Sequence, residues 1–339
     1  MSGTLTIPNS IGAQPGPQVQ ASLFDTNWTT IASYVNAREV TQGLLSARPT
    51  VGVAGRWYYA TDTGQLFADN GTTWVTVATP ASGIAEQLTG LGLTWTSGTA
   101  ITVAVGAATS DDAVLLSRVT MSSLSTIQGN TAGTWVVGTN QNKLDAGAIG
   151  ASQNWHVFLI ERVDTGVVDI LFSLSPTAPA LPTNYTKQRR IGSFTTDGAN
   201  AIAAFVQDGD EFLLSGATLP AIYTATNPGT AAVLATLPGI PTGVKMGAIA
   251  NFTMHPATTA GIFVYLSSPD AADAAPSLTA SPLSGFNASA DAAVTDSAAY
   301  LATIRTNTSA QIRYRLSASG AADVVRIQAL GWVDRRGRG

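Results

Sequence analysis

The stretch Gly55–Val77 constrains the fold more than any other part of the chain. It holds three runs rich in aromatic and β-branched residues, which suit the pleated, half-buried surface of a sheet. Asp62-Thr63-Gly64 and Asp69-Asn70-Gly71 separate the runs, and glycine or asparagine supplies the positive φ that tight hairpins need. We predict strands over 56–60, 65–68 and 73–77. About 23 residues cannot bury a core alone, so this hairpin module needs other chains or a neighbouring domain.

The composition favours a protein that assembles with others. The chain has 339 residues, enough for two or three domains. Only 11% of them are charged, roughly half the usual share for a soluble protein. A surface so poor in charge is explained if other subunits bury much of it. The net charge of −4 provides no basic field for nucleic acid, so no nucleic-acid partner is expected.

Several classes of site and segment are excluded by what the sequence lacks. Cysteine is absent, which removes disulfides, thiolate metal sites and cysteine nucleophiles. No run reaches the roughly 18 apolar residues of a membrane span, so no membrane insertion is expected. The first residues contain neither a basic segment nor an apolar core of a signal peptide, so we expect synthesis in a cytoplasm without export by such a signal.

The N-terminal region predicts an extended leader followed by one short helix. Prolines in residues 1–18 disfavour helix at the residues before them. Over 22–38, apolar residues recur at spacings of four, three and four, and Ser22 stands three residues before an acid, close to a capping box. The apolar residues are Phe24, Trp28, Ile31 and Val35. This stripe should pack against copies of itself or a docking surface.

The rest of the chain predicts strands. After a polar linker at 79–83, the runs 93–96 and 101–105 form a pair that can extend the hairpin module or begin the next domain. From 119 onward, turn signals separate strands at the spacing of an antiparallel β-sandwich. The predicted strands are 155–162, 167–173, 189–195, 201–206, 211–214, 243–254, 260–267, 300–305, 311–317 and 324–334, with a polar loop over 269–298.

The last strands form a predicted closing hairpin with a one-sided pattern. Ile312, Tyr314 and Leu316 share one face of their strand, while Arg313 and Arg315 share the other. This period of two is typical of a sheet with one buried face. We expect 324–334 to be the hairpin partner of 311–317.

Four segments resemble bacteriophage virion proteins. The hairpin unit 55–77 is similar to one that recurs in phage tail fibres, between an attachment segment and larger β domains. Ile7-Pro8-Asn9, 24–28 and 34–36 resemble the N-terminal region of phage tail-fibre and neck-fibre proteins. The order of segments from Trp155 through 189–193 to 210–212 resembles a β domain of phage tail proteins, and 331–336 resembles its C-terminal end.

The resemblance and the patterns together define the expected architecture. The fold class is mainly β: a short N-terminal helix and a β-hairpin module, then an antiparallel, jelly-roll-like β-sandwich region, in an intertwined trimer. The expected domains are a virion-anchoring segment at 1–45, the hairpin module at 46–80, a connecting β segment at 81–118 and the sandwich region at 119–339, with two subdomains dividing near 238 left open.

Neither histidine nor the carboxylates predict a catalytic or metal site. His156 and His255 lie about 100 residues apart, and two isolated histidines are too few ligands for a zinc site. The Gly-x-Ser-x-Gly motif that carries a nucleophilic serine is absent from the sequence. Acid pairs matter because phage tail proteins include glycosidases; the candidates are Asp111 with Asp112, Asp208 with Asp210 and Glu211, and Asp270 with Asp273. Most sit in turns that favour aspartate, and no β-helix repeat is visible. We expect no enzyme, cofactor or catalytic residue; a cation at Asp208, Asp210 and Glu211 remains a weaker alternative.

Arginines and aromatic residues are the remaining binding candidates. Arg189 with Arg190, or Arg313 with Arg315, can grip acidic sugars or phosphates, although strand arginines more often protect exposed faces and edges. The residues Trp57, Tyr58, Tyr59 and Trp74 can stack on sugars, but packing between chains is favoured for them. The basic end at 334–339 is read as a solvated tail or a subunit contact.

The resemblance implies a structural virion protein. We expect a homotrimeric tail fibre that attaches to other virion proteins through residues 1–45 and contacts a host glycan or lipopolysaccharide through its C-terminal β region. A head or neck fibre, a collar or baseplate component without receptor binding, and a glycan-degrading tailspike remain open alternatives.

Overall fold

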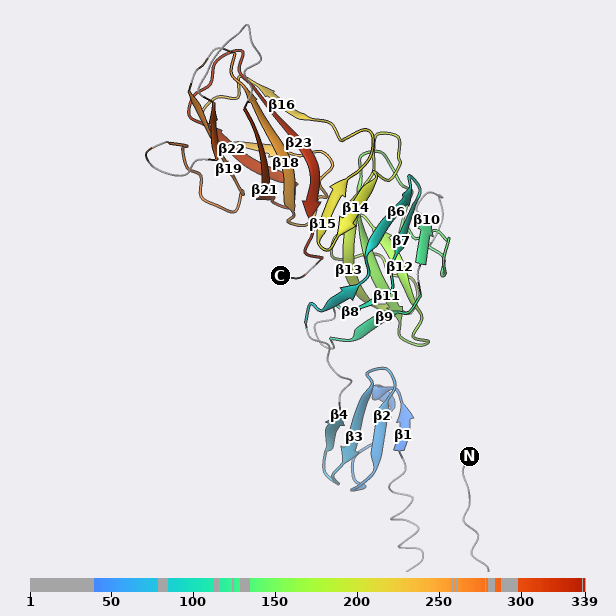
Figure 1. The fold of residues 1–339 in the computed structure, drawn as a ribbon. Coiled ribbons are helices and arrows are strands. Elements are labelled where there is room, and N and C mark those ends of the chain that lie inside the picture. The colour runs from blue at the N-terminus through green and yellow to red at the C-terminus, as the bar shows by residue number, and fades with distance from the viewer. Residues whose placement is uncertain are drawn as a thin grey trace, which may run out of the picture. The chain divides into compact units, whose positions relative to one another are not determined.

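The fold is mainly β and divides into two compact units, residues 1–80 and 81–339 (Figure 1). The computed structural model describes residues 40–78, 85–111, 116–123, 125–128, 135–257, 259, 261–277, 279, 284–287, 298–336 and 338. The helix predicted over 22–38 lies outside these residues. Within the described ranges, no helix has the length and apolar character that crossing a membrane would require.

The first unit is a four-stranded sheet built on the hairpin module. Its strands are β1 (Val40–Gly43), β2 (Trp57–Ala60), β3 (Gln65–Asp69) and β4 (Trp74–Ala78), in that order, and a short 3-10 turn spans Leu45–Ala47. The three predicted strands are confirmed, and Gly64 and Gly71 have the expected positive φ of 66° and 93°. The sequence did not predict β1, which pairs in parallel with β2.

One face of the module's sheet is covered by side chains of the module itself. Tyr58 and Phe67 are buried against Leu45 and Trp74, and the Tyr58 and Trp74 rings meet edge to face with centroids 6.1 Å apart. The carboxylate of Asp69 accepts backbone hydrogen bonds from the covering loop and pairs with an arginine in it. Packing between chains is therefore wrong for Tyr58, because its ring is buried in the module's own small core. Trp74 is half-buried at the edge of the same core, and packing between chains stays a prediction for it.

The other face of this sheet is apolar and partly exposed. Strand register places Val40, Trp57, Ala68 and Val75 in one row across all four strands. The next row along β2 and β3 pairs Tyr59 with a leucine. Val40, Tyr59 and Val75 are 58%, 38% and 47% exposed. We call these residues the module's apolar face; it includes no charged side chain.

The first half of the second unit contains three small sheets around a shared core. Its strands are β5 (Leu88–Gly90), β6 (Leu93–Ser97), β7 (Ala100–Val103), β8 (Gly106–Thr109), β9 (Arg118–Met121), β10 (Ser125–Gln128), β11 (Asn154–Arg162), β12 (Val168–Ser173) and β13 (Tyr185–Thr195). They form the sheets β10-β7-β6, β5-β8-β9 and β12-β11-β13. Leu93, Ile101 and Val103 are buried with Trp155 and Phe172. The strand pair at 93–103 therefore belongs to the second unit and does not extend the hairpin module.

The second half places two larger sheets face to face (Figure 1). The strands are β14 (Phe205–Asp208), β15 (Glu211–Leu214), β16 (Tyr223–Thr226), β17 (Val233–Thr236), β18 (Gly247–His255), β19 (Ile262–Ser267), β20 (Gly285–Asn287), β21 (Ala298–Arg305), β22 (Gln311–Leu316) and β23 (Val324–Val333). One sheet has the order β14-β15-β23-β18-β21, with β16 also on β23, and the other has the order β17-β22-β19-β20. Across the interface Phe252 of β18 meets Tyr314 of β22, with ring centroids 6.0 Å apart.

Two sequence predictions about these strands are wrong. The last hairpin does not form: β22 pairs with β17 and β19, whereas β23 pairs with β15, β16 and β18 in the opposite sheet. A strand pattern does not specify its partner, and chain proximity misled the pairing. The predicted strand 201–206 is mostly irregular, because Ile202 makes only an isolated bridge to Thr196 and β14 starts at Phe205. The one-sided pattern of β22 is confirmed: Ile312, Tyr314 and Leu316 are buried, and the arginines between them are not.

A buried ion pair lies within the first half of the second unit. Lys143 is completely buried, and its Nζ lies 2.8 Å from Oδ2 of Asp169 and donates to the carbonyl of Val136. The ammonium also lies 5.0 Å from the centroid of the Trp135 ring. Burial lowers the pKa of Lys143, and its contact with Asp169 works in the opposite direction.

Candidate functional site

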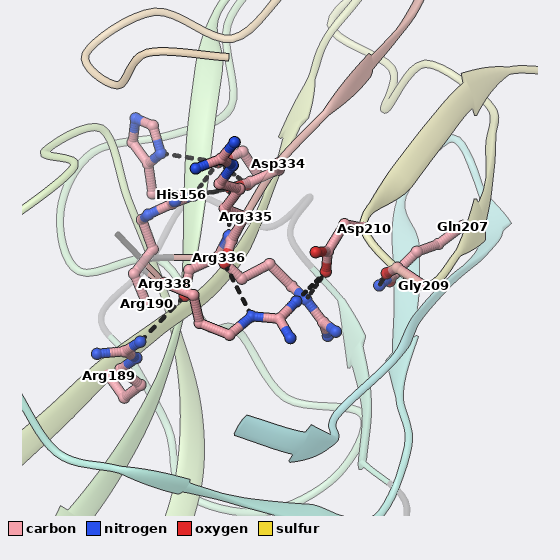
Figure 2. Close-up of polar contacts among 11 residues, drawn as sticks. His156, Arg189, Arg190, Gln207, Gly209, Asp210, Asp334, Arg335, Arg336 and Arg338 are labelled. Carbon is pink, nitrogen blue, oxygen red and sulfur yellow. Dashed lines mark hydrogen bonds and ion pairs between the residues drawn. The ribbon is translucent and has the colours of Figure 1, made fainter. Parts of the chain in front are cut away.

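The chain end folds back onto β13 and forms a buried polar network. Asp334, which follows β23, is 1% exposed and binds both terminal nitrogens of Arg190 at 2.7 and 2.8 Å (Figure 2). Arg190 also donates to Ser193 at 2.9 Å, and Asp334 accepts from the backbone of Arg336. Burial alone would raise the pKa of Asp334, but the charge and hydrogen bonds of Arg190 outweigh it and hold the pKa below its ordinary value of 3.8.

His156 completes this network from β11 and stays neutral there. Its Nδ1 lies 2.9 Å from the hydroxyl oxygen of Ser193, and its ring is 1% exposed. Burial, together with the charge of Arg190, lowers its pKa to about 4. A serine, a histidine and an aspartate thus lie together, but not as a catalytic triad. Asp334 contacts Ser193 and Arg190 rather than orienting the imidazole, and Ser193 is fully buried.

A second group of ion pairs fastens the rest of the basic end. Asp210, in the turn between β14 and β15, pairs with Arg338 and lies 3.5 Å from Nε of Arg336 (Figure 2). Arg189 pairs with Asp111 at 2.8 Å and donates to the carbonyl of Arg336. The interpretation of 334–339 as a solvated tail is wrong for Asp334 and Arg336, because both are buried and paired.

Beside this network the surface is hollowed by a cavity of about 560 Å³. Charged side chains dominate its lining, and they come from β13, the start of β18, the end of β21 and the chain end. The cationic ones are Arg190, Lys245, Arg305, Arg335 and Arg338, and the acidic ones are Glu86 and Asp334. We call this cavity the basic hollow.

Positive charge is in excess around the basic hollow. Asp334 neutralises Arg190, while Lys245 and Arg305 share Asp270 at 2.8 and 3.6 Å. Arg335 is exposed, and no ion pair of its side chain occurs in the described part of the chain. Among the described residues, the hollow and its direct ion-pair partners contain six cations and four carboxylates. The cations are Arg190, Lys245, Arg305, Arg335, Arg336 and Arg338, and the carboxylates are Glu86, Asp210, Asp270 and Asp334. The hollow can therefore attract an anion, although the whole chain has a net charge of −4.

A second cavity, of about 650 Å³, has a different character. It lies where the ends of β11 and β13 approach the loops that follow β15 and β17, and neutral side chains such as Asn154 and Thr242 line it. Among the described residues, Asp197 is its one charged lining residue, and its Oδ1 accepts backbone hydrogen bonds from Ala199 and Ala201. This neutral cavity contains no pair of acids for glycoside hydrolysis.

The predicted acidic candidates do not converge on a site. Asp111, Asp210, Asp270 and Asp273 each pair with a different set of cations. Asp112 lies outside the described residues. In the part of the chain that the structure describes, no three histidine, aspartate or glutamate side chains gather as metal ligands, and so the set Asp208, Asp210 and Glu211 is not one.

The predicted arginine pairs are also engaged within the chain. Arg189 and Arg190 are 4% and 7% exposed, so neither role predicted for them, ligand binding or protection of an exposed face, fits. Arg313 donates to the carbonyls of Pro269 and Ala271, and Arg315 pairs with Asp273. His255 is half-buried at the end of β18.

Sequence reasoning missed Lys245 and Arg305, which line the basic hollow from the loop before β18 and from the end of β21. Each is a lone cation in an otherwise ordinary β segment, and no local signal joins them. The chain matches no known family model and no curated protein.

Proposed function

We propose that this protein is a structural component of a bacteriophage virion, a homotrimeric tail fibre attached through residues 1–45. Its C-terminal β region contacts an acceptor on the host surface. The observation that carries the proposal is the hairpin module, whose sequence resembles a unit of phage fibres and whose sheet has an apolar, partly exposed row across all four strands.

The apolar face supports association between copies of the chain. Its central row, Val40, Trp57, Ala68 and Val75, has no charge that would repel the same row of another copy. The module's own core, on the other face, is small: within residues 40–78, its buried apolar residues are Tyr58, Ala60 and Phe67. Burial of the apolar face by further copies would supply the stabilisation that such a small core lacks.

Absence of catalysis is part of the proposal. Asp111, Asp210, Asp270 and Asp273 are tied up in ion pairs, and Ser193 and His156 are sealed from solvent. Incubation of the purified protein with host polysaccharide should release no reducing ends. Release of reducing ends would refute the non-enzymatic fibre and favour a glycan-degrading tailspike.

The location of the protein tests the proposal directly. Electron micrographs of particles with this protein immunolabelled should show the label on the tail. Label at the head or neck would favour a fibre attached there, and label confined to a collar or baseplate, without competition for adsorption, would favour a purely structural component.

The trimer is tested in solution by light scattering coupled to size exclusion. The wild-type chain should have three times the mass of one copy, and Val75→Asp should shift it toward the monomer because a carboxylate would enter the apolar face. Val206→Asp is the matched control, since Val206 is 57% exposed on β14 of the other unit. A monomeric wild type, or equal behaviour of the two variants, would refute association through this face.

A further inference from the structure

We infer that the basic hollow binds the phosphate or carboxylate group of an acidic saccharide. This inference rests on the proposed function, because it names the chemical class that the C-terminal β region would recognise. The shared chemistry is a negatively charged oxygen group on a sugar, and the experiment below separates its two sources.

Positive charge is concentrated at the basic hollow. The whole chain has 17 lysines and arginines, and five of them line this one hollow. Asp334 neutralises Arg190, so this arginine adds no net positive charge to the hollow. The others reach the hollow from β21, the start of β18 and the chain end, so segments far apart in the sequence bring their charges together.

Two guanidinium groups of the hollow are available to a ligand. Arg305 has a side chain 63% exposed, and its Nε lies 3.6 Å from Asp270, beyond hydrogen-bonding distance. Arg335 is exposed and has no ion pair in the described ranges. The planar guanidinium group presents paired donors that match the oxygens of a phosphate or carboxylate.

The chain on both sides of Arg335 is held in place. Asp334 is fixed by Arg190, and the backbone nitrogen of Arg336 donates to Asp334 at 2.7 Å. Asp210 fixes Arg338 (Figure 2). Binding then requires ordering of one side chain rather than of a loop, which lowers the entropy lost on association.

The size of the hollow fits a saccharide unit. Its volume of about 560 Å³ lies within the range of small-ligand sites. Thr303 adds a hydroxyl to the lining, and the half-buried Val244 and Val333 add apolar surface against which a sugar ring can lie. The neutral cavity has a similar volume but lacks cations, so it offers nothing comparable to an anion.

The experiment measures binding of three sugars to the full chain by titration calorimetry and NMR. Glucose 1-phosphate tests phosphate, glucuronate tests carboxylate, and glucose is the uncharged control. We expect saturable binding of at least one charged sugar, none of glucose, and weakening as sodium chloride screens the charges. No saturable binding of either charged sugar at millimolar concentration would overturn the inference.

Charge-removing variants locate the site. Arg305→Gln and Arg335→Gln should each weaken binding of the charged sugar by about threefold to tenfold, since each removes one charge-assisted contact at the surface. Arg326→Gln is the matched control, because Arg326 is exposed on β23 outside the hollow. All three variants replace an exposed arginine by a neutral polar side chain, so melting temperatures should match the wild type. Equal affinity in the Arg305, Arg335 and Arg326 variants would refute binding in the hollow.

Competition with phage for adsorption separates this inference from the fibre proposal. If wild-type protein blocks adsorption and the Arg305 and Arg335 variants block it less, both ideas are supported. If all variants block equally, the fibre proposal stands and the hollow is not its contact. If the protein binds charged sugars but does not block adsorption and is not found on the virion by immunolabelling, the saccharide site is supported and the fibre proposal fails.

Discussion

Asp334→Asn should destabilise the second unit strongly, although the change is nearly isosteric. Asp334 is 1% exposed and both of its oxygens accept from Arg190, which is itself 7% exposed. The amide keeps the volume and one acceptor oxygen but removes the negative charge. Arg190 would then remain buried without a counter-charge, because its other partner, Ser193, is neutral.

The expected loss follows from the cost of orphaning one member of a buried ion pair, about 3–5 kcal/mol. We take the lower end, about 3 kcal/mol, because asparagine still accepts one hydrogen bond. For a unit of this size, that loss lowers the melting temperature by roughly 6–12 °C. Calorimetry, or the fluorescence of Trp155 and Trp332, which are fully buried in the same core, would report it.

Acid titration provides a second, independent measurement. The folded-state pKa of Asp334 is lowered, so its contribution to stability is present above its ordinary pKa of 3.8 and is lost as pH falls through the folded-state value. The gap between wild type and Asp334→Asn should therefore be full near neutral pH and shrink below pH 3.8.

Two outcomes would refute this reasoning. A change below about 0.5 kcal/mol would mean that the pair is effectively solvated. The double variant Arg190→Met with Asp334→Leu removes both charges, so it should lose less stability than the two single changes added together. Strict additivity would show that the two side chains do not interact. Arg326→Gln, an exposed change on the strand that leads to Asp334, is the control.

Two further changes test other buried groups. Burial lowers the pKa of His156 from 6.5 to about 4, so the unfolded chain binds a proton at a higher pH than the folded chain, and wild-type stability should fall as pH drops from 6.5 to 4. His156→Gln should remove this pH dependence of the free energy of unfolding in urea. An unchanged pH dependence would contradict the burial argument. Lys143→Met should lower the free energy of thermal unfolding by about 3–5 kcal/mol, because Asp169 stays buried without its cation. Adding Asp169→Leu should restore part of this loss, and a double variant no more stable than Lys143→Met would count against the ion pair.

Local patterns were enough to predict most strands and the class of the fold. The alternation of Ile312, Tyr314 and Leu316 with arginines specified which face of β22 is buried. The glycines at 64 and 71 specified the turns of the hairpin module. These features depend on neighbours within a few residues, because side chains alternate along a strand and turns need particular φ values.

The partners of β22 and β23, and the candidate site, were decided by the tertiary structure. Arg190 and Asp334 are 144 residues apart, and they meet only because the residues after β23 cross over β13. The pattern of β23 is equally compatible with pairing to β22, the neighbour in sequence that it does not choose. The same long-range packing places Lys245, Arg305 and Arg335 around one hollow. Hydrophobic periodicity determines which side of a strand is buried, but which strands become neighbours depends on the packing of the whole core.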